Sequence, residues 1–180
     1  MEALHTQTPV NARLASLVSE LQHVVDTRDV PADIAEQAAA ALGRYRGIDD
    51  VLTDDQRRGT LEHYTRHILY ADPAERFTLV SLVWHPGQFT PVHGHHTWCA
   101  YAILSGSMSE ERYRWDATRE LAVHTDNVRR GECNSVWGQA GLEAIHRLRN
   151  VSEEVAVSLH VYGVPVGRVT THVNRVLKTA

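Results

Sequence analysis

The sequence predicts a mainly β protein in which α-helices precede an antiparallel sandwich or barrel. Its 180 residues fit one domain with a hydrophobic core of its own. Apolar residues recur at helical spacing in the first part of the chain, and many short strand-like runs follow one another after Glu62. We therefore expect a single domain over residues 1–180, with a helical segment over 1–60 that packs on a β-barrel over 61–180.

Three helices are expected in the N-terminal segment. The first is capped at Thr8, has a proline as its first helical residue, and carries apolar residues at helical spacing, namely Val10, Leu14, Leu17, Val18, Leu21 and Val25. The second runs from Pro31 through an alanine run to Leu42, where Gly43 is expected to end it. A short third helix is expected at "TDDQRR", from Thr53. Packing against the barrel is the role we expect for all three.

The rest of the chain is expected to form short strands. Runs rich in Val, Ile, Thr, Tyr and Trp are separated by Asp-Pro, Pro-Gly, Ser-Gly, Arg-Gly and Trp-Gly turns. The expected strands are 62–70, 76–85, 90–95, 97–105, 108–115, 119–124, 133–137, 143–149 and 154–162, with an extended tail beyond 170. The inner face of such a barrel can hold a site.

The composition of the chain indicates which kinds of binding partner to expect. The formal net charge is −4 and the basic residues are scattered, so we expect neither a nucleic acid nor a membrane surface as partner, and a small molecule is favoured. The N-terminus lacks the pattern of a secretory signal, and no apolar run is long enough to span a bilayer. The expected location is cytoplasmic, where Cys99 and Cys133 would stay reduced.

The stretch "GQFTPVHGHHTW" places three histidines within four positions. Alternate residues of a strand point the same way, so His93 and His95 are expected to face one side and His96 the other. Two imidazoles on one face can share a metal ion, although close histidines also occur without metal. By the same alternation, Tyr64 and Arg66 would both project inward, where an arginine can bind a carboxylate through two hydrogen bonds. The alternative is a surface arginine.

A wider pattern surrounds these histidines. Gly87, His93-Gly94-His95, Cys99 and Gly106 reproduce the spacing of the first cupin motif, and Gly131, His146 and Asn150 resemble the second. Cys99 stands where that motif normally has a glutamate ligand, so a three-histidine site remains. From 64 to 162 the chain resembles the type I cysteine dioxygenase family, and the matching elements are "YTR", "HGH", "HRLRN" and "SLHVY".

This resemblance implies a cupin fold, that is, a double-stranded β-helix or jelly-roll barrel. It implies that Fe²⁺ is the cofactor, bound by His93, His95 and His146, because three neutral imidazoles suit a first-row divalent metal and leave open positions. Zn²⁺ is the alternative metal, but it has no redox chemistry. Tyr64 and Arg66 would belong to the strand that binds the substrate carboxylate.

The element "SLHVY" resembles the family's Ser-His-Tyr relay. Ser158, His160 and Tyr162 alternate along one strand, so they can form a hydrogen-bonded row, although packing alone could also explain a buried row of this kind. The relay would hold the tyrosine hydroxyl near the iron. Cys99 has the strand parity of His93 and His95, and the resemblance implies a thioether between Cys99 and Tyr162. The alternative for Cys99 is a free buried thiol.

The chain departs from the family pattern at three places. Family members often have Asp where this chain has Gly94, and a small residue or Thr where it has His96. The usual proline of the second motif is absent from "VWGQAG". These departures concern loop shape and the surroundings of the site, and strand parity makes His96 a residue outside the ligand set.

The expected function is the oxidation of a small thiol carboxylate by dioxygen to the sulfinic acid, with L-cysteine as the substrate. Related enzymes that act on 3-mercaptopropionate usually have glutamine in place of Arg66, which favours cysteine. Mercaptosuccinate and 3-mercaptopropionate remain alternatives, and so does a non-catalytic cupin that binds a small acid. A cupin isomerase or a quercetinase-like enzyme would leave the "YTR" and "SLHVY" elements unexplained.

Arg168 is a second candidate anion contact. The resemblance is to proteins that often work as monomers.

Overall fold

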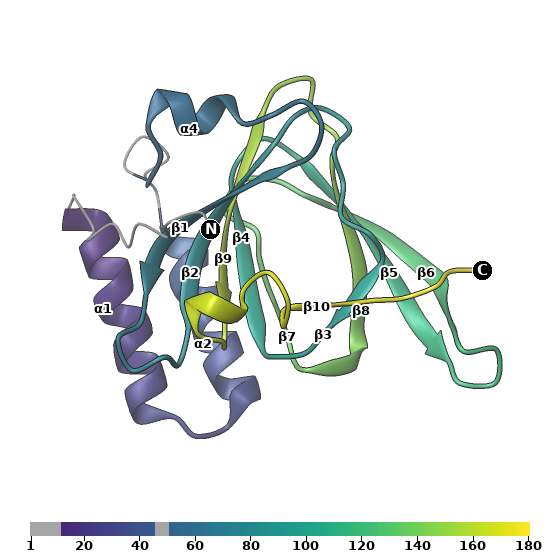
Figure 1. The fold of residues 1–180 in the computed structure, drawn as a ribbon, viewed down its shortest axis with the longest axis horizontal. Coiled ribbons are helices and arrows are strands. Elements are labelled where there is room, and N and C mark those ends of the chain that lie inside the picture. Colours follow the sequence, from purple (N-terminus) through teal and green to yellow (C-terminus); the bar gives the residue numbers. More distant parts are fainter. Residues whose placement is uncertain (1–11, 46–50) are drawn as a thin grey trace.

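The computed structural model describes residues 12–45 and 51–180, and it contains two five-stranded sheets that face each other (Figure 1). Sheet A has the spatial order β1 (Thr65–Ala71), β2 (Thr78–Trp84), β9 (Ala156–Tyr162), β4 (Cys99–Ser105) and β7 (Ser135–Gly138). Sheet B has the order β10 (Asn174–Val176), β3 (His93–His95), β8 (Gly141–Asn150), β5 (Met108–Asp116) and β6 (Leu121–Arg130). Neighbouring strands of both sheets are antiparallel. The predicted mainly β cupin fold with N-terminal helices is confirmed.

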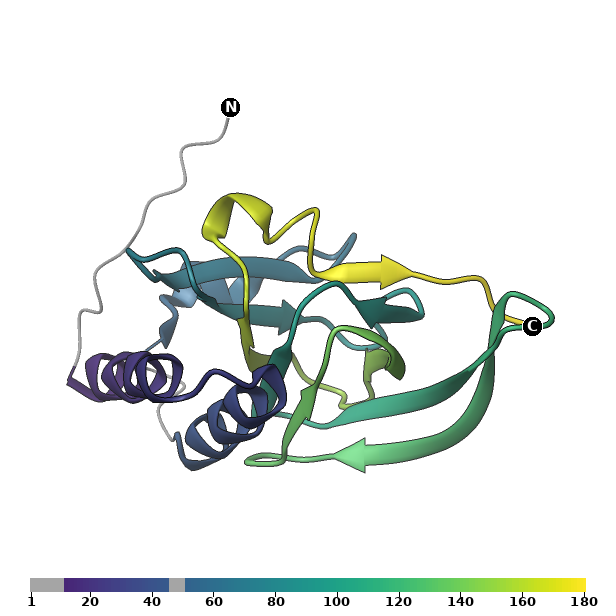
Figure 2. The same ribbon diagram turned by 90° about the horizontal axis from the view of Figure 1, so that it is seen from below.

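Two helices, α1 (Ala12–Thr27) and α2 (Pro31–Arg44), lie against the outer face of sheet A, as Figure 2 shows from a second direction. Every residue of β2 is buried, because one face of this strand packs on the helices and the other on sheet B. Leu79 and Val83 belong to the helix-side core, whereas Val80 and Leu82 belong to the core between the sheets. Sheet A therefore has a hydrophobic core on each of its two faces. Because the helices cover its outer face, a site can lie on its inner face, between the sheets. None of the described helices is long and apolar enough to cross a membrane.

The helix boundaries differ from the prediction at one place. The expected cap at Thr8 lies outside the described residues. The second helix continues through Gly43 to Arg44, so the prediction that this glycine ends the helix was wrong. A Cβ at Gly43 would lie 2.8 Å from Oγ of Ser135, so glycine lets α2 approach β7 closely. The short helix α4 (Asp54–Arg58) is confirmed, and Thr53 caps it.

The strands follow the predicted ranges with two main differences. β3 has only three residues. β6 continues to Arg130, six residues beyond its predicted end at 124, because it is an exposed edge strand whose polar sequence does not alternate with apolar residues. A short 3₁₀ helix (Val166–Arg168) precedes the predicted tail. The tail beyond 170 contains the short strand β10. β10 pairs with β3, so the tail of the chain lies beside the "HGH" strand.

Candidate metal centre

Three buried histidines meet between the sheets. His93 and His95 come from β3, and His146 comes from β8, where its Cα is paired with that of His93. One ring nitrogen from each histidine lies within 4.8 Å of the other two. The register between β3 and β8 shifts between the pairings of His93 and His95, since His93 is paired with His146 and His95 with Gly141. The structure thus brings together the three residues named as ligands, of which strand parity had placed His93 and His95 on one face and the family motifs had added His146.

The hydrogen bonds at these rings fit a metal ion. Nδ1 of His93 lies 2.9 Å from the carbonyl oxygen of Pro91, and Nδ1 of His146 lies 3.1 Å from Oε1 of Glu110. Both acceptors require a hydrogen on Nδ1, which leaves the lone pair on Nε2. Burial, and then the charge of His146, lowers the pKa of His93 to about 3. Burial also lowers the pKa of His95 well below its usual value. Neutral imidazoles with free lone pairs are the donors that first-row divalent metals bind.

The close approach of β3 and β8 explains the glycine between His93 and His95. A Cβ at Gly94 would lie 2.5 Å from the backbone oxygen of Gly141, which is closer than real Cβ contacts. The sequence departs from the usual aspartate here, and in this structure no larger residue fits without movement of a strand.

Gly94→Ala should therefore weaken metal binding at least ~10-fold and destabilise the protein by about 1–3 kcal/mol, because the strand that carries two of the candidate ligands must move. Metal affinity is measured by chelator competition and stability by denaturant unfolding. Gly131→Ala is the matched control, since a Cβ there meets nothing within 4 Å. Equal metal affinity of the two variants would contradict this account.

Arg66 and Tyr64 lie where the sequence places them. Both line the cavity of the metal centre, together with Trp84 and the three histidines. The ring of Tyr64 packs on that of Trp84 with centroids 4.5 Å apart. Nε of Arg66 is buried without a hydrogen-bond partner among the described residues, and one terminal nitrogen has a long contact of 3.5 Å to the carbonyl oxygen of Val169. The guanidinium group therefore has donors left for a ligand in the cavity.

The Ser-His-Tyr row forms on β9 as predicted. Oγ of Ser158 lies 2.8 Å from Nε2 of His160, and the hydroxyl of Tyr162 lies 3.1 Å from Nδ1 of the same ring. Sequence reasoning missed a fourth member, Trp84, whose Nε1 donates to Oγ of Ser158 at 2.9 Å. The signal was available, because a buried indole N–H needs an acceptor.

The indole sets the direction of the row. Trp84 can only donate, so Oγ of Ser158 accepts from it and gives its own hydrogen to Nε2 of His160. Burial, and then the charge of Arg66, lowers the pKa of His160, which keeps the ring neutral. Nδ1 then carries the hydrogen and donates to Tyr162, whose own hydroxyl hydrogen is left for the cavity. Burial raises the pKa of Tyr162, so the hydroxyl stays protonated.

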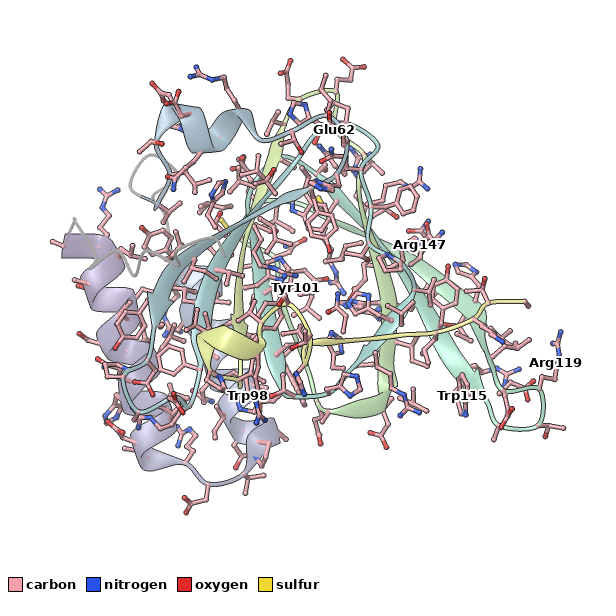
Figure 3. All side chains as sticks on the ribbon, in the orientation of Figure 1. Glu62, Trp98, Tyr101, Trp115, Arg119 and Arg147 are labelled. Atoms are coloured by element: carbon pink, nitrogen blue, oxygen red, sulfur yellow. The ribbon has the colours of Figure 1, made fainter. Side chains whose placement is uncertain are left out.

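Cys99 lies opposite Tyr162. The two Cα atoms are paired in the register of β4 and β9, and both side chains line the metal cavity. Burial raises the pKa of the Cys99 thiol to about 12, so it is a neutral thiol. Tyr101, two residues further along β4, lies near the centre of the barrel in Figure 3 and stacks on His160 with centroids 5.3 Å apart.

Three further residues considered in the sequence lie away from the histidine cluster. His96 is exposed and is not part of the histidine cluster. Arg168 is exposed on the 3₁₀ helix and does not line the metal cavity. Cys133 is a free, half-buried cysteine outside the cavity.

Glu110 is the charged residue that sequence reasoning missed. Its side chain is buried on β5, and it connects His146 to Arg130. Burial alone would raise the pKa of Glu110, but the hydrogen bonds and charges of His146 and Arg130 lower it to about 2. Strand parity places Glu110 on the same face as Met108, but its partners on β6 and β8 cannot be read from that parity.

Comparison with known proteins gives a family and several distant structures. The model of the family described as cysteine dioxygenase type I matches residues 5–175. A protein from Thermus thermophilus is 22% identical with a TM-score of 0.48, and the alignment covers 63% of this chain and 97% of that one. A Klebsiella pneumoniae protein with a double-stranded β-helix domain is 14% identical with a TM-score of 0.49, covering 68% and 91%. An oxalate oxidase is 13% identical with a TM-score of 0.46, covering 58% and 53%.

Proposed function

The chain belongs to the cysteine dioxygenase type I family, and from this premise we propose that it is an iron-dependent thiol dioxygenase. It would add both atoms of dioxygen to the sulfur of a small thiol carboxylate, L-cysteine, and so form cysteine sulfinate. The observation that carries the proposal is the position of Arg66, whose Nε has no partner among the described residues, in the same cavity as three converging histidines.

His93, His95 and His146 would hold the metal. Fe²⁺ would supply the redox chemistry that lets dioxygen react with a thiolate, which Zn²⁺ cannot supply. Histidine binds a metal as a neutral imidazole, so a ligand set of three histidines would bring no negative charge. A substrate thiolate would bring that charge, which favours binding of the thiol before dioxygen.

Arg66 would bind the substrate carboxylate through two charge-assisted hydrogen bonds. The row from Trp84 to Tyr162 would hold one hydroxyl proton at Oη, pointing into the cavity, where negative charge develops on oxygen during the reaction.

Two alternative functions use the same cavity. Mercaptosuccinate and 3-mercaptopropionate also offer a thiolate and a carboxylate, and a non-catalytic cupin could bind a small acid in the same cavity. Oxygen uptake by the ferrous protein with cysteine, cysteamine, 3-mercaptopropionate and mercaptosuccinate separates these cases. Fastest uptake with cysteine is expected, with the sulfinate as product. Absence of uptake with every thiol by iron-loaded protein would favour the binding protein.

Arg66→Gln should raise KM for cysteine far more than for cysteamine, which has no carboxylate. Loss of a bidentate, charge-assisted contact corresponds to about 2–4 kcal/mol in kcat/KM. Steady-state oxygen uptake with both thiols measures the effect. Arg168→Gln removes the same charge from an exposed position outside the cavity and should leave both KM values unchanged. An equal effect of Arg66→Gln on cysteine and cysteamine would show that Arg66 does not bind the carboxylate.

A thioether between Cys99 and Tyr162 is part of the proposal. Its support is the direct pairing of the two residues across β4 and β9. Dioxygen would be the oxidant, and the bond between Sγ and the tyrosine ring would form with loss of one hydrogen from each partner. We also propose that the protein acts in the cytoplasm.

A further inference from the structure

We propose that Glu110 is a positioning residue for the metal centre. One oxygen of its carboxylate accepts a hydrogen bond from His146, and the other oxygen is bound by Arg130 and Arg112. This inference rests on the metal centre proposed above and adds a charged group to it that lies outside the ligand set.

The register of sheet B brings these residues together. β5 lies between β6 and β8. Glu110 is paired with Val128 on β6 and with Leu148 on β8, so Arg130 and His146 are its diagonal neighbours, one on each adjacent strand. Diagonal cross-strand neighbours on one face lie within reach of long side chains. The alternation of β5 also brings Arg112 to the same face.

The two carboxylate oxygens have different partners. Oε1 accepts from Nδ1 of His146 at 3.1 Å. Oε2 accepts from Nε of Arg130 at 3.0 Å and from a terminal nitrogen of the same guanidinium at 2.5 Å, and it has two longer contacts of 3.3 Å with Arg112. Arg130 is the main partner, since its side chain is 16% exposed and that of Arg112 is 45% exposed. The arginines thus fix the carboxylate in place and leave one oxygen for the histidine.

This arrangement makes the three histidines unequal. The Nδ1 hydrogen of His93 is donated to a neutral backbone carbonyl, and Nδ1 of His95 is buried without a partner among the described residues. His146 donates to an ionised carboxylate. A carboxylate acceptor fixes the ring orientation and increases the basicity of the nitrogen that faces the metal, and loss of such a partner typically weakens metal binding 10–100-fold. We therefore expect His146 to be the strongest donor of the three.

A merely structural role predicts something different. If Glu110 served only to neutralise the buried Arg130, its replacement would change folding stability and leave the metal centre of the folded protein unaltered. Measurements on the metal itself therefore decide between the two roles. Co²⁺ is a suitable probe, because its affinity is obtained by chelator competition and its visible absorption bands report the strength of the ligand donors.

The test compares three variants. Glu110→Gln keeps the size and an acceptor oxygen for His146 but removes the charge. Because it also leaves Arg130 facing an amide, the double variant Glu110→Gln with Arg130→Gln replaces the ion pair by an amide pair. Glu111→Gln is the matched control. Glu111 is the next residue on β5, and its carboxylate contacts Tyr113 and Arg147 rather than a ligand histidine.

The expected result is that both Glu110 variants bind Co²⁺ about 10–100-fold more weakly than the wild-type protein and show shifted absorption bands. The Glu111 control should match the wild-type protein in both measurements. Wild-type affinity and spectrum in the double variant would overturn the inference, because the effect of the single change would then come from the unpaired arginine. Failure of the wild-type protein to bind any divalent metal would instead overturn the proposed function.

Discussion

His146→Ala should abolish oxygen uptake and most iron binding. This change removes one of three converging ring nitrogens, and two histidines from the short strand β3 remain. The loss of affinity should exceed the ~100-fold that follows the loss of an outer hydrogen-bond partner. Iron per chain is measured on anaerobically loaded protein after removal of free metal, and turnover is measured by oxygen uptake with cysteine.

His96→Ala is the matched control for this prediction. His96 is adjacent to the ligands in sequence but exposed, so its replacement should keep one iron per chain and wild-type turnover. Because the His146 variant also leaves Glu110 without one of its hydrogen-bond donors, circular dichroism should first establish that the protein is folded. Full iron occupancy in folded His146→Ala protein would remove the basis for the three-histidine centre.

Tyr162→Phe should lower turnover by roughly 10- to 1000-fold while iron content stays unchanged. The ring remains, and only the hydroxyl is lost from the end of the hydrogen-bonded row. One preorganised donor near developing negative charge contributes about this much. Single-turnover oxygen uptake and iron analysis on the same sample separate an effect on chemistry from an effect on loading.

Tyr70→Phe is the control for loss of a tyrosine hydroxyl. Its hydroxyl accepts from Gln22 of α1 on the helix side of sheet A, so turnover should not change. Wild-type turnover in Tyr162→Phe would contradict the proposed role of the row. Intact-mass and peptide analysis of the wild-type protein reports the proposed cross-link, which the Phe variant is expected to lack. A fully active wild-type protein without the cross-link would show that the bond is dispensable here.

Strand alternation made much of the site predictable. His93, His95, Arg66 and Tyr162 face the same cavity because a period of two decides which side chains of a strand point inward. Cys99 also faces it, but the parity argument that linked Cys99 to His93 and His95 does not hold, because β3 and β4 belong to different sheets. The strands themselves were predictable because turn residues bound nearly every one of them. Alternation alone does not reveal which strands are neighbours, and the meeting of β3 with β8 was inferred from the family motifs.

The residues that sequence reasoning missed have partners on neighbouring strands, and alternation does not reveal which strands are neighbours. Glu110 looks like an ordinary acidic residue in a polar strand, and only the placement of β5 between β6 and β8 gives it Arg130 and His146 as partners. Trp84 ends an apolar run and reads as core until the register of β2 and β9 brings it to Ser158. Gly43 was misread because a glycine that ends a helix and one that permits close packing look the same in sequence.

The pairing of β10 with β3 has a consequence for how the protein folds. β3 carries two of the proposed ligands in only three residues, and it is held by β8 on one side and by β10 on the other. Both partners come much later in the chain than β3. Contacts between distant segments form slowly, because the entropy of closing the intervening loop is lost before the contact stabilises the chain. During synthesis, the N-terminal helices can therefore form well before the metal-binding pocket, which has to wait until residues 174–176 have left the ribosome.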